Sequence, residues 1–112
     1  MIKVTMNVDE NGVIRGVSLW GHASQYSLEE SSSICFAVSS VLYTIEQIDP
    51  DGVRRFDKGD FCYEPVINTL NPTMEDEHKF TLVEFLVTHL FTLASKYSKC
   101  FTFERRILQY DN

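Results

Sequence analysis

The amino-acid sequence predicts an α+β fold, a two-layer α/β sandwich in which two helices pack on a mainly antiparallel sheet in the order ββαββαβ. Alternating apolar residues at the amino-terminal end predict a β-hairpin, and two longer segments repeat apolar residues at helical spacing. Short alternating segments between and after the helices predict three more strands. The 112 residues, 44% of them hydrophobic, suit a single domain with one core over residues 1–112.

The first two strands form the predicted hairpin. Apolar residues alternate with polar neighbours in the first strand, at Ile2, Val4, Met6 and Val8. Asn11-Gly12 predicts a turn, and residues 13–20 resume a strand. His22 follows directly, after Gly21, and a glycine permits an unusual backbone angle or the close approach of another segment. We therefore expect the imidazole at one end of the sheet.

The first helix is predicted from residue 34 to residue 48, after a polar loop over residues 24–33. Its apolar residues repeat at helical spacing: Ile34, Val38, Val41, Ile45 and Ile48. This assignment places Cys35 in the first turn, where the free amides and the partial positive charge of a helix start favour a thiolate. One of Ser31, Ser32 and Ser33 is expected to cap the helix, and the sequence leaves open which one.

The second half of the chain predicts a further hairpin, a helix and a last strand. Residues 53–56 and 61–67 flank a polar turn at 57–60, and both strands are expected to extend the first sheet. Thr73 with Asp76, or the acidic run at 75–77, predicts the start of a helix that continues to about Tyr97. Residues 101–108 predict the last strand.

The second helix has an unusually broad apolar surface. Its inward stripe is predicted to be Val83, Leu86, Val87, Leu90, Ala94 and Tyr97. Further apolar side chains extend beyond one ordinary face: Phe80, Phe85, Phe91 and Leu93. We expect some of this surface to be buried by a second subunit.

Composition excludes several functional classes. Sixteen acidic and ten basic residues give a net charge of -6, which argues against direct nucleic-acid binding and favours a basic protein or peptide as partner. The first six residues resemble a strand and lack the features of a secretory signal, so we expect the mature protein to begin there. No apolar stretch approaches the ~18 residues of a membrane span, so we expect a soluble, cytoplasmic protein that does not bind a membrane.

The cysteines favour a reducing compartment. Cys35, Cys62 and Cys100 are an odd number and lack the spacing of a disulfide framework. The three cysteines and three histidines also include no close pair of metal ligands. We therefore expect neither a metal ion nor another cofactor.

Cys35 and His22 are the candidate catalytic residues. A thiol becomes nucleophilic near neutral pH when a neighbouring base takes its proton, and a histidine can later return that proton to the leaving amine. This pair predicts thiol-dependent peptide hydrolysis, with the amides at the helix start as a possible oxyanion site. Ser39, one helical turn after Cys35, is a supporting candidate. The other cysteines are interpreted as small buried hydrophobic residues and the other histidines as noncatalytic.

Two motifs resemble the bacterial ribosomal-processing cysteine protease family known as Prp. They are Gly21-His22-Ala23 and Cys35-Phe36-Ala37-Val38-Ser39, and the similarity extends over nearly the whole chain. The resemblance implies a small homodimer without a cofactor, with His22 and Cys35 as a dyad. It also implies that the enzyme removes an N-terminal extension from the precursor of the basic large-subunit ribosomal protein L-twenty-seven, by cleavage within a short segment containing hydrophobic and aromatic residues.

The chain departs from the family pattern just before Cys35. Where Gly-x-Asp-Ile-Val-Cys is usual, Glu30 replaces the glycine and Ser32 replaces the aspartate. Ser32 can cap a helix as an aspartate does, although it supplies no carboxylate, and we assign it with Gly21 and Ser39 to the supporting or substrate-binding residues.

The sequence leaves two other functions open. One is a noncatalytic ribosome-associated binding protein that recognises the same basic partner through its acidic surface. The other is a redox regulator in which Cys35 is oxidised reversibly, although no resolving cysteine is evident.

Overall fold

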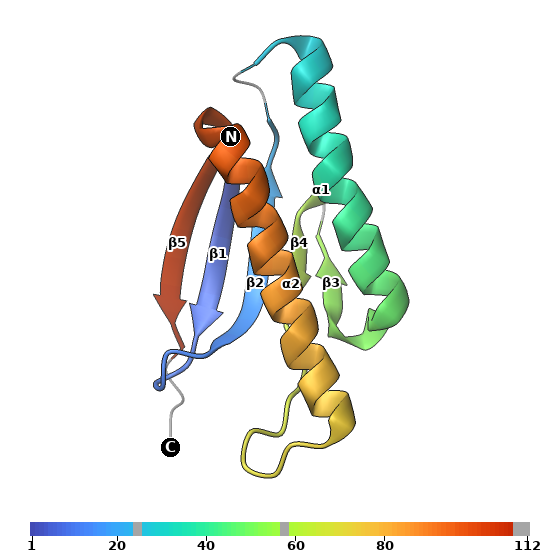
Figure 1. Ribbon diagram of the computed structural model, residues 1–112, viewed down its shortest axis with the longest axis vertical. Helices are drawn as coiled ribbons and strands as arrows, with labels where there is room; N and C mark the ends of the chain where they lie inside the picture. The colour runs from blue at the N-terminus through green and yellow to red at the C-terminus, as the bar shows by residue number, and fades with distance from the viewer. Residues whose placement is uncertain (24–25, 57–58, 109–112) are drawn as a thin grey trace.

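A computed structural model describes residues 1–23, 26–56 and 59–108 (Figure 1). In this part of the chain the order of strands and α-helices is the predicted ββαββαβ. The elements are β1 (Ile2–Val8), β2 (Ile14–Gly21), α1 (Leu28–Ile48), β3 (Val53–Arg55), β4 (Phe61–Tyr63), α2 (Met74–Lys96) and β5 (Phe101–Ile107). Two short 3-10 helices, η1 (Pro50–Gly52) and η3 (Ser98–Cys100), follow the two α-helices.

The strands form one sheet in the spatial order β3-β4-β2-β1-β5. The neighbours β1–β2, β2–β4 and β3–β4 pair antiparallel, and β1–β5 pair parallel. The parallel pair arises because the chain crosses the sheet through α2 before it returns beside β1. The two helices lie side by side over one face of the sheet, which confirms the predicted sandwich (Figure 1).

The core lies between the sheet and the two helices. It is formed by apolar side chains from both layers, among them Val4, Val8, Val17, Ile34, Ile45, Phe61, Val83, Leu86 and Leu90. Four residues of the stripe predicted for α2 are buried, namely Val83, Leu86, Val87 and Leu90, whereas Ala94 and Tyr97 near its end are half-buried. Helical spacing therefore identified the inner face of α2 correctly.

The predicted start of the first helix was wrong, because α1 begins at Leu28 rather than near Ile34. Ser27 is the N-cap, and its hydroxyl accepts a hydrogen bond from the Glu30 amide at 3.2 Å. None of Ser31, Ser32 and Ser33 caps the helix. Residues 28–33 are helical although they were predicted as loop, and residues 24 and 25 lie outside the described residues.

Serine side chains inside α1 explain this error. The Ser33 hydroxyl donates to the Glu29 carbonyl at 3.1 Å, and the Ser31 hydroxyl donates to the Tyr26 carbonyl at 3.3 Å. A serine that bonds a carbonyl one turn earlier is compatible with a helix interior, although serine favours caps and turns on average. Since most side chains of this first stretch are exposed, it also shows no apolar period.

The second hairpin is shorter than predicted. β3 ends at Arg55 and β4 at Tyr63, so residues 64–67, predicted as strand, lie outside the sheet. Pro65 explains this end because proline has no amide hydrogen for a strand ladder. The prediction that this hairpin extends the first sheet is confirmed, because β4 pairs with β2. Residues 57 and 58 of the predicted turn are not among those described.

A capping box starts α2, as Thr73 and Asp76 predicted. The Asp76 amide donates to the Thr73 hydroxyl at 3.3 Å, and the Thr73 amide donates to the Asp76 carboxylate at 2.8 Å. The other carboxylate oxygen accepts the Asn68 amide at 3.1 Å. Backbone hydrogen bonds, first from Thr73 and then from Asn68, lower the pKa of Asp76 below its ordinary value.

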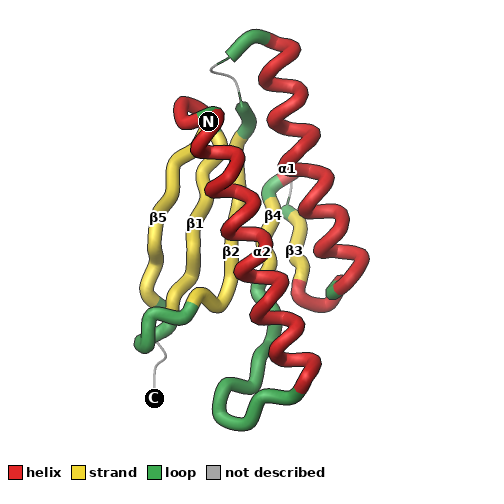
Figure 2. Tube along the Cα trace, viewed as in Figure 1, coloured by secondary structure: helices red, strands yellow, loops and turns green. Residues whose placement is uncertain are grey.

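Among the described residues, no helix combines the length and the apolar character that a membrane crossing requires. The loop that joins β4 to α2 lies at the opposite end of the molecule from the end of β2 (Figure 2). The capping box of α2 is therefore remote from His22.

We predict that Asp76→Asn lowers the melting temperature at pH 7, because the ionised carboxylate accepts the hydrogen bonds that start α2. Since folding lowers the pKa of Asp76, its contribution is present above the ordinary value of 3.8 and is lost as pH falls through the lower folded pKa. The stability difference from wild type should therefore shrink below about pH 4. Thermal unfolding between pH 2 and 7 measures this, with exposed Glu84→Gln as control. A difference that stays constant with pH would contradict the assignment.

Candidate active site

Gly21 controls the path of the chain at the end of β2. Its φ of 93° is a left-handed conformation that other residues rarely adopt. A Cβ atom at this position would also overlap the carbonyl oxygen of Met1, which directly precedes the neighbouring strand β1. Both predicted roles of Gly21, an unusual backbone angle and a close approach, are confirmed. The adjoining carbonyl of His22 accepts a hydrogen bond from the α-amino group of Met1.

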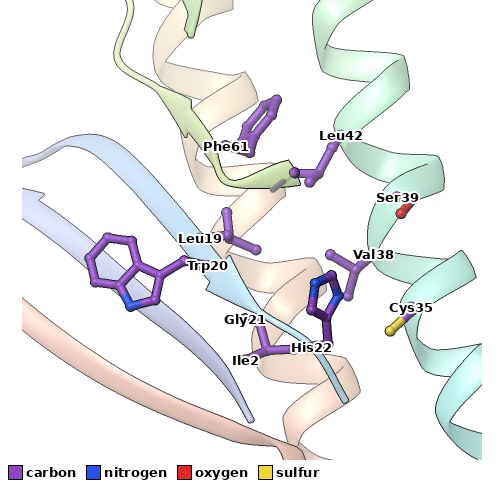
Figure 3. Close-up of a pocket in the computed structure, with 11 residues that line it drawn as sticks. Ile2, Leu19, Trp20, Gly21, His22, Cys35, Val38, Ser39, Leu42 and Phe61 are labelled. Atoms are coloured by element: carbon purple, nitrogen blue, oxygen red, sulfur yellow. The ribbon is translucent and has the colours of Figure 1, made fainter. Parts of the chain in front are cut away.

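The turn at Gly21 directs His22 toward α1. In a regular strand, residues two positions apart point to the same face, so His22 would share a face with Trp20. Figure 3 instead shows the Trp20 indole on one side of β2 and the His22 imidazole on the other side, facing α1. The imidazole is exposed.

One side of α1 faces the end of β2 and carries Cys35, Val38, Ser39 and Leu42. Their spacing of three, four and seven residues is the spacing that places side chains on one helical face. Cys35 is half-buried, and its sulfur points from the helix toward the side on which His22 lies (Figure 3). Val38 and Leu42 are buried, whereas Ser39 is exposed at the rim.

The end of β2 and this side of α1 border a pocket of about 80 Å³. Its apolar lining includes Ile2, Leu19, Val38, Leu42 and Phe61, and its other lining residues are Trp20, Gly21, His22, Cys35, Ser39 and Gly59. A thiol and an imidazole thus share a small pocket with an apolar floor, an arrangement typical of ligand and active sites. Of the residues singled out in the sequence, the fold brings together Gly21, His22, Cys35 and Ser39.

Ser32 does not belong to this group, although it precedes Cys35 by only three residues on α1. It is exposed on α1 and does not line the pocket. Its predicted capping role is also wrong, since Ser27 caps the helix. Ser32 is therefore not among the residues that line the pocket, and its supporting or substrate-binding role stays a prediction.

Cys35 lies in the third turn of α1, so the prediction that it lies in the first turn was wrong. Cys35 is seven positions after Leu28, which corresponds to roughly 10 Å along the helix axis. The effect of the helix dipole falls off within the first turn, and the free amides also belong to that turn. The predicted activation of Cys35 by the helix start, and the predicted oxyanion site there, are therefore wrong.

Several pocket residues were not anticipated from the sequence. Val38 and Leu42 follow Cys35 at helical spacing, and this signal could have identified them. Phe61 reaches the pocket because β4 pairs with β2 and places it opposite Leu19. That register depends on long-range pairing, which no local pattern reveals.

The remaining cysteines and histidines lie outside the pocket. Cys62 and Cys100 are buried free thiols, as their interpretation as small hydrophobic residues requires. His78 is exposed, and His89 is half-buried on α2 with no hydrogen-bond partner for its Nε2 among the described residues. In the same part of the chain, no three histidine, cysteine or acidic side chains are arranged to hold a metal ion.

We predict that Gly21→Ala destabilises the protein more than Gly12→Ala does. Both glycines have positive φ, so alanine at either position costs about 1–2 kcal/mol through the left-handed backbone. A Cβ at Gly12 meets open space, whereas a Cβ at Gly21 meets backbone that cannot easily move, which adds about 1–3 kcal/mol. Denaturant unfolding of both variants measures the difference, and equal destabilisation would show that the contact with Met1 is unimportant.

The family described as cysteine protease Prp matches residues 1–102 of the chain. The fold is similar to two crystal structures of the essential ribosomal processing protease Prp from S. aureus. One, in complex with a covalently linked product peptide, has a TM-score of 0.73 at 18% sequence identity. The other, in complex with a substrate peptide, has a TM-score of 0.72 at 17% identity. Each similarity covers 95% of this chain and 100% of the other chain.

A crystal structure of SMU.848 from Streptococcus mutans is also similar, with a TM-score of 0.64, 22% identity and 96% coverage of both chains. None of the curated proteins matches the chain in sequence. At these identities the solved structures establish the shared fold, and the family match over residues 1–102 establishes the enzyme class predicted from the thiol and the imidazole. The chain belongs to the cysteine protease Prp family.

Proposed function

We propose that this chain is a cysteine endopeptidase whose catalytic dyad is His22 and Cys35. In this proposal it removes the N-terminal extension from the precursor of large-subunit ribosomal protein L-twenty-seven. The main support is that both side chains line one pocket although they come from different elements. The family match and the similarity to a ribosomal processing protease crystallised with peptides support the same reaction.

The proposed reaction proceeds through a thioester. The His22 imidazole accepts the proton of the Cys35 thiol, and the thiolate attacks the carbonyl carbon of the scissile peptide bond. As the tetrahedral intermediate collapses, the carbon–nitrogen bond breaks and the imidazolium gives its proton to the leaving amine. Water, deprotonated by His22, then attacks the thioester and releases the second product with the free thiol.

Because Cys35 lies in the third turn of α1 and not at its start, the activation of its thiol depends more strongly on His22. Because the free amides and the dipole of the helix start are too distant, the proposed base is the main source of activation for the thiol. Ser39 is the proposed supporting residue, since its exposed side chain lies at the rim one turn after Cys35. Gly21 supports the dyad through the turn that directs the imidazole toward α1. None of these chemical steps is assigned to Ser32.

The charge of the chain suits the proposed substrate. A net charge of -6 attracts a basic ribosomal protein, and this attraction mainly increases the rate of association. Two exposed carboxylates, Glu29 and Glu30, lie in the first turn of the helix that carries Cys35. A cytoplasmic location fits both the ribosomal substrate and the need for a reduced thiol.

We also propose that the protein forms a homodimer through the outer face of the two helices. Phe36, Ile48 and Phe85 are 76%, 60% and 51% exposed. Two adjoining grooves on this face share Thr44 and Phe85, so these apolar side chains form one continuous surface. Contiguous apolar surface of this kind is typical of subunit contacts.

The first test of the proposed function is mass spectrometry of a precursor N-terminal peptide incubated with wild type, Cys35→Ala or His22→Ala. We expect one defined cut by wild type and a loss of roughly 1,000-fold or more in rate for each variant. Ser32→Ala serves as the matched control and should cleave at the wild-type rate.

The outcome separates the alternatives. Peptide binding by wild type and Cys35→Ala without any cleavage would favour a noncatalytic binding protein. Reversible modification of Cys35 by peroxide without peptide turnover would favour a redox regulator.

The dimer proposal predicts that Phe85→Glu shifts the protein from dimer to monomer, because it places a charge in the centre of the apolar face. Light scattering after size-exclusion chromatography measures the mass, which should fall by half. Leu70→Glu is the control, since this side chain is 97% exposed and lies outside both grooves. A monomeric wild type, or a Phe85→Glu dimer, would contradict the proposed interface.

A further inference from the structure

A second hollow lies next to the active-site pocket, on the face of the sheet that the helices leave open. It encloses about 470 Å³, compared with about 80 Å³ for the pocket that contains the proposed dyad. Sites for small ligands usually measure roughly 300–1,000 Å³, so the pocket at the dyad is too small to hold more than a small part of a peptide. A peptide substrate therefore needs further surface beyond Cys35.

The two hollows adjoin each other at Trp20 and Phe61, because both residues line both of them. Trp20 precedes His22 by two residues on β2, and its indole points away from α1 (Figure 3). The side chain is 40% exposed. Trp20 therefore borders both hollows, with its indole on the side away from α1 (Figure 3).

The lining of the outer hollow favours an apolar side chain. Trp20 is joined there by Phe56, which is 56% exposed. Exposed aromatic rings of this kind bury a large area on binding and lose little conformational entropy. Ser18 and the buried Asn7 line the same hollow; the Ser18 hydroxyl donates to the Cys62 sulfur at 3.4 Å, which leaves its oxygen able to accept from a peptide amide.

The charges of this hollow are balanced. Arg54 pairs with Glu64 at 2.8 Å. Among the described residues that line the hollow, the remaining charges are Asp60 and Arg106, one of each sign. The described part of the lining thus has no net charge that would select a strongly acidic or basic side chain, and its aromatic rings favour an apolar one.

We propose that the outer hollow is an extended substrate subsite that binds a bulky apolar side chain of the peptide, and that Trp20 is a specificity-determining residue. The occupant is the same peptide that is cleaved at Cys35, since the subsite continues the active-site pocket. This inference rests on the proposed function. Trp20 and Phe56 contact the apolar side chain, and the scissile bond stays at the dyad.

Trp20 provides a direct probe because it is the only tryptophan of the chain. A fluorescein-labelled precursor peptide without tryptophan is titrated into Cys35→Ala protein, which keeps the subsite but cannot cleave. Polarisation of the label reports binding, and in parallel titrations with unlabelled peptide the emission of Trp20 reports contact at the subsite. We expect peptide binding to change the emission of Trp20 and to reduce its quenching by acrylamide. The dissociation constant from Trp20 emission should equal the one from polarisation of the label.

Saturable binding with no change at Trp20 would overturn the subsite and leave the proposed function intact. No binding by Cys35→Ala together with no cleavage by wild type would remove the proposed function and, with it, this inference. The two failures are therefore distinguishable.

A kinetic measurement tests the apolar contact separately. For the full precursor peptide, Phe56→Ala should raise KM roughly tenfold with little change in kcat, because the lost contact is remote from the scissile bond. For a peptide shortened to the residues beside the scissile bond, Phe56→Ala and wild type should have equal kinetics. Leu70→Ala is the control with both peptides. An equal effect of Phe56→Ala on both peptides, or no effect on either, would overturn the subsite.

Discussion

The close contact between Gly21 and Met1 is the constraint on which the site depends. β1 and β2 pair until their ends, where Ile2 lies opposite Gly21 and the backbone of Met1 leaves no room for a Cβ atom. At the same residue, a positive φ interrupts the alternation of the strand and turns His22 toward α1. Gly21 thus determines both the close packing of the strand ends and the direction of the imidazole.

The position of Cys35 within α1 has both a structural and a chemical consequence. In the third turn the thiol is held by a rigid helix that is anchored in the core through Ile34 and Val38. The same position is too far from the helix start for its dipole to stabilise a thiolate. The proposed activation therefore depends on His22, and the two packed elements β2 and α1 fix the positions of the two side chains. The substrate surface extends from this junction past Trp20 to the open face of the sheet.

Much of this arrangement could be predicted because it follows from local patterns in the sequence. The Asn11-Gly12 turn, the capping box of Thr73 and Asp76, and the spacing of apolar residues identified the hairpin and α2. The start of α1 could not be predicted, since Ser31 and Ser33 donate hydrogen bonds to carbonyls five and four residues earlier instead of capping the helix. The thiol, the imidazole and Gly21 were identified by their chemistry and order. Phe61 was missed because only the pairing of β2 with β4 places it opposite Leu19 at the site.

The most direct test of the central claim is the rate at which iodoacetamide alkylates each cysteine at neutral pH, measured by peptide mapping in wild type, His22→Ala and Gly21→Ala. We predict that Cys35 reacts much faster than buried Cys62 and Cys100 in wild type, and that both substitutions slow Cys35 by roughly tenfold or more. Ser32→Ala should leave the rate unchanged. If Cys35 reacts equally fast without His22, the imidazole does not activate the thiol, and the proposed dyad is wrong.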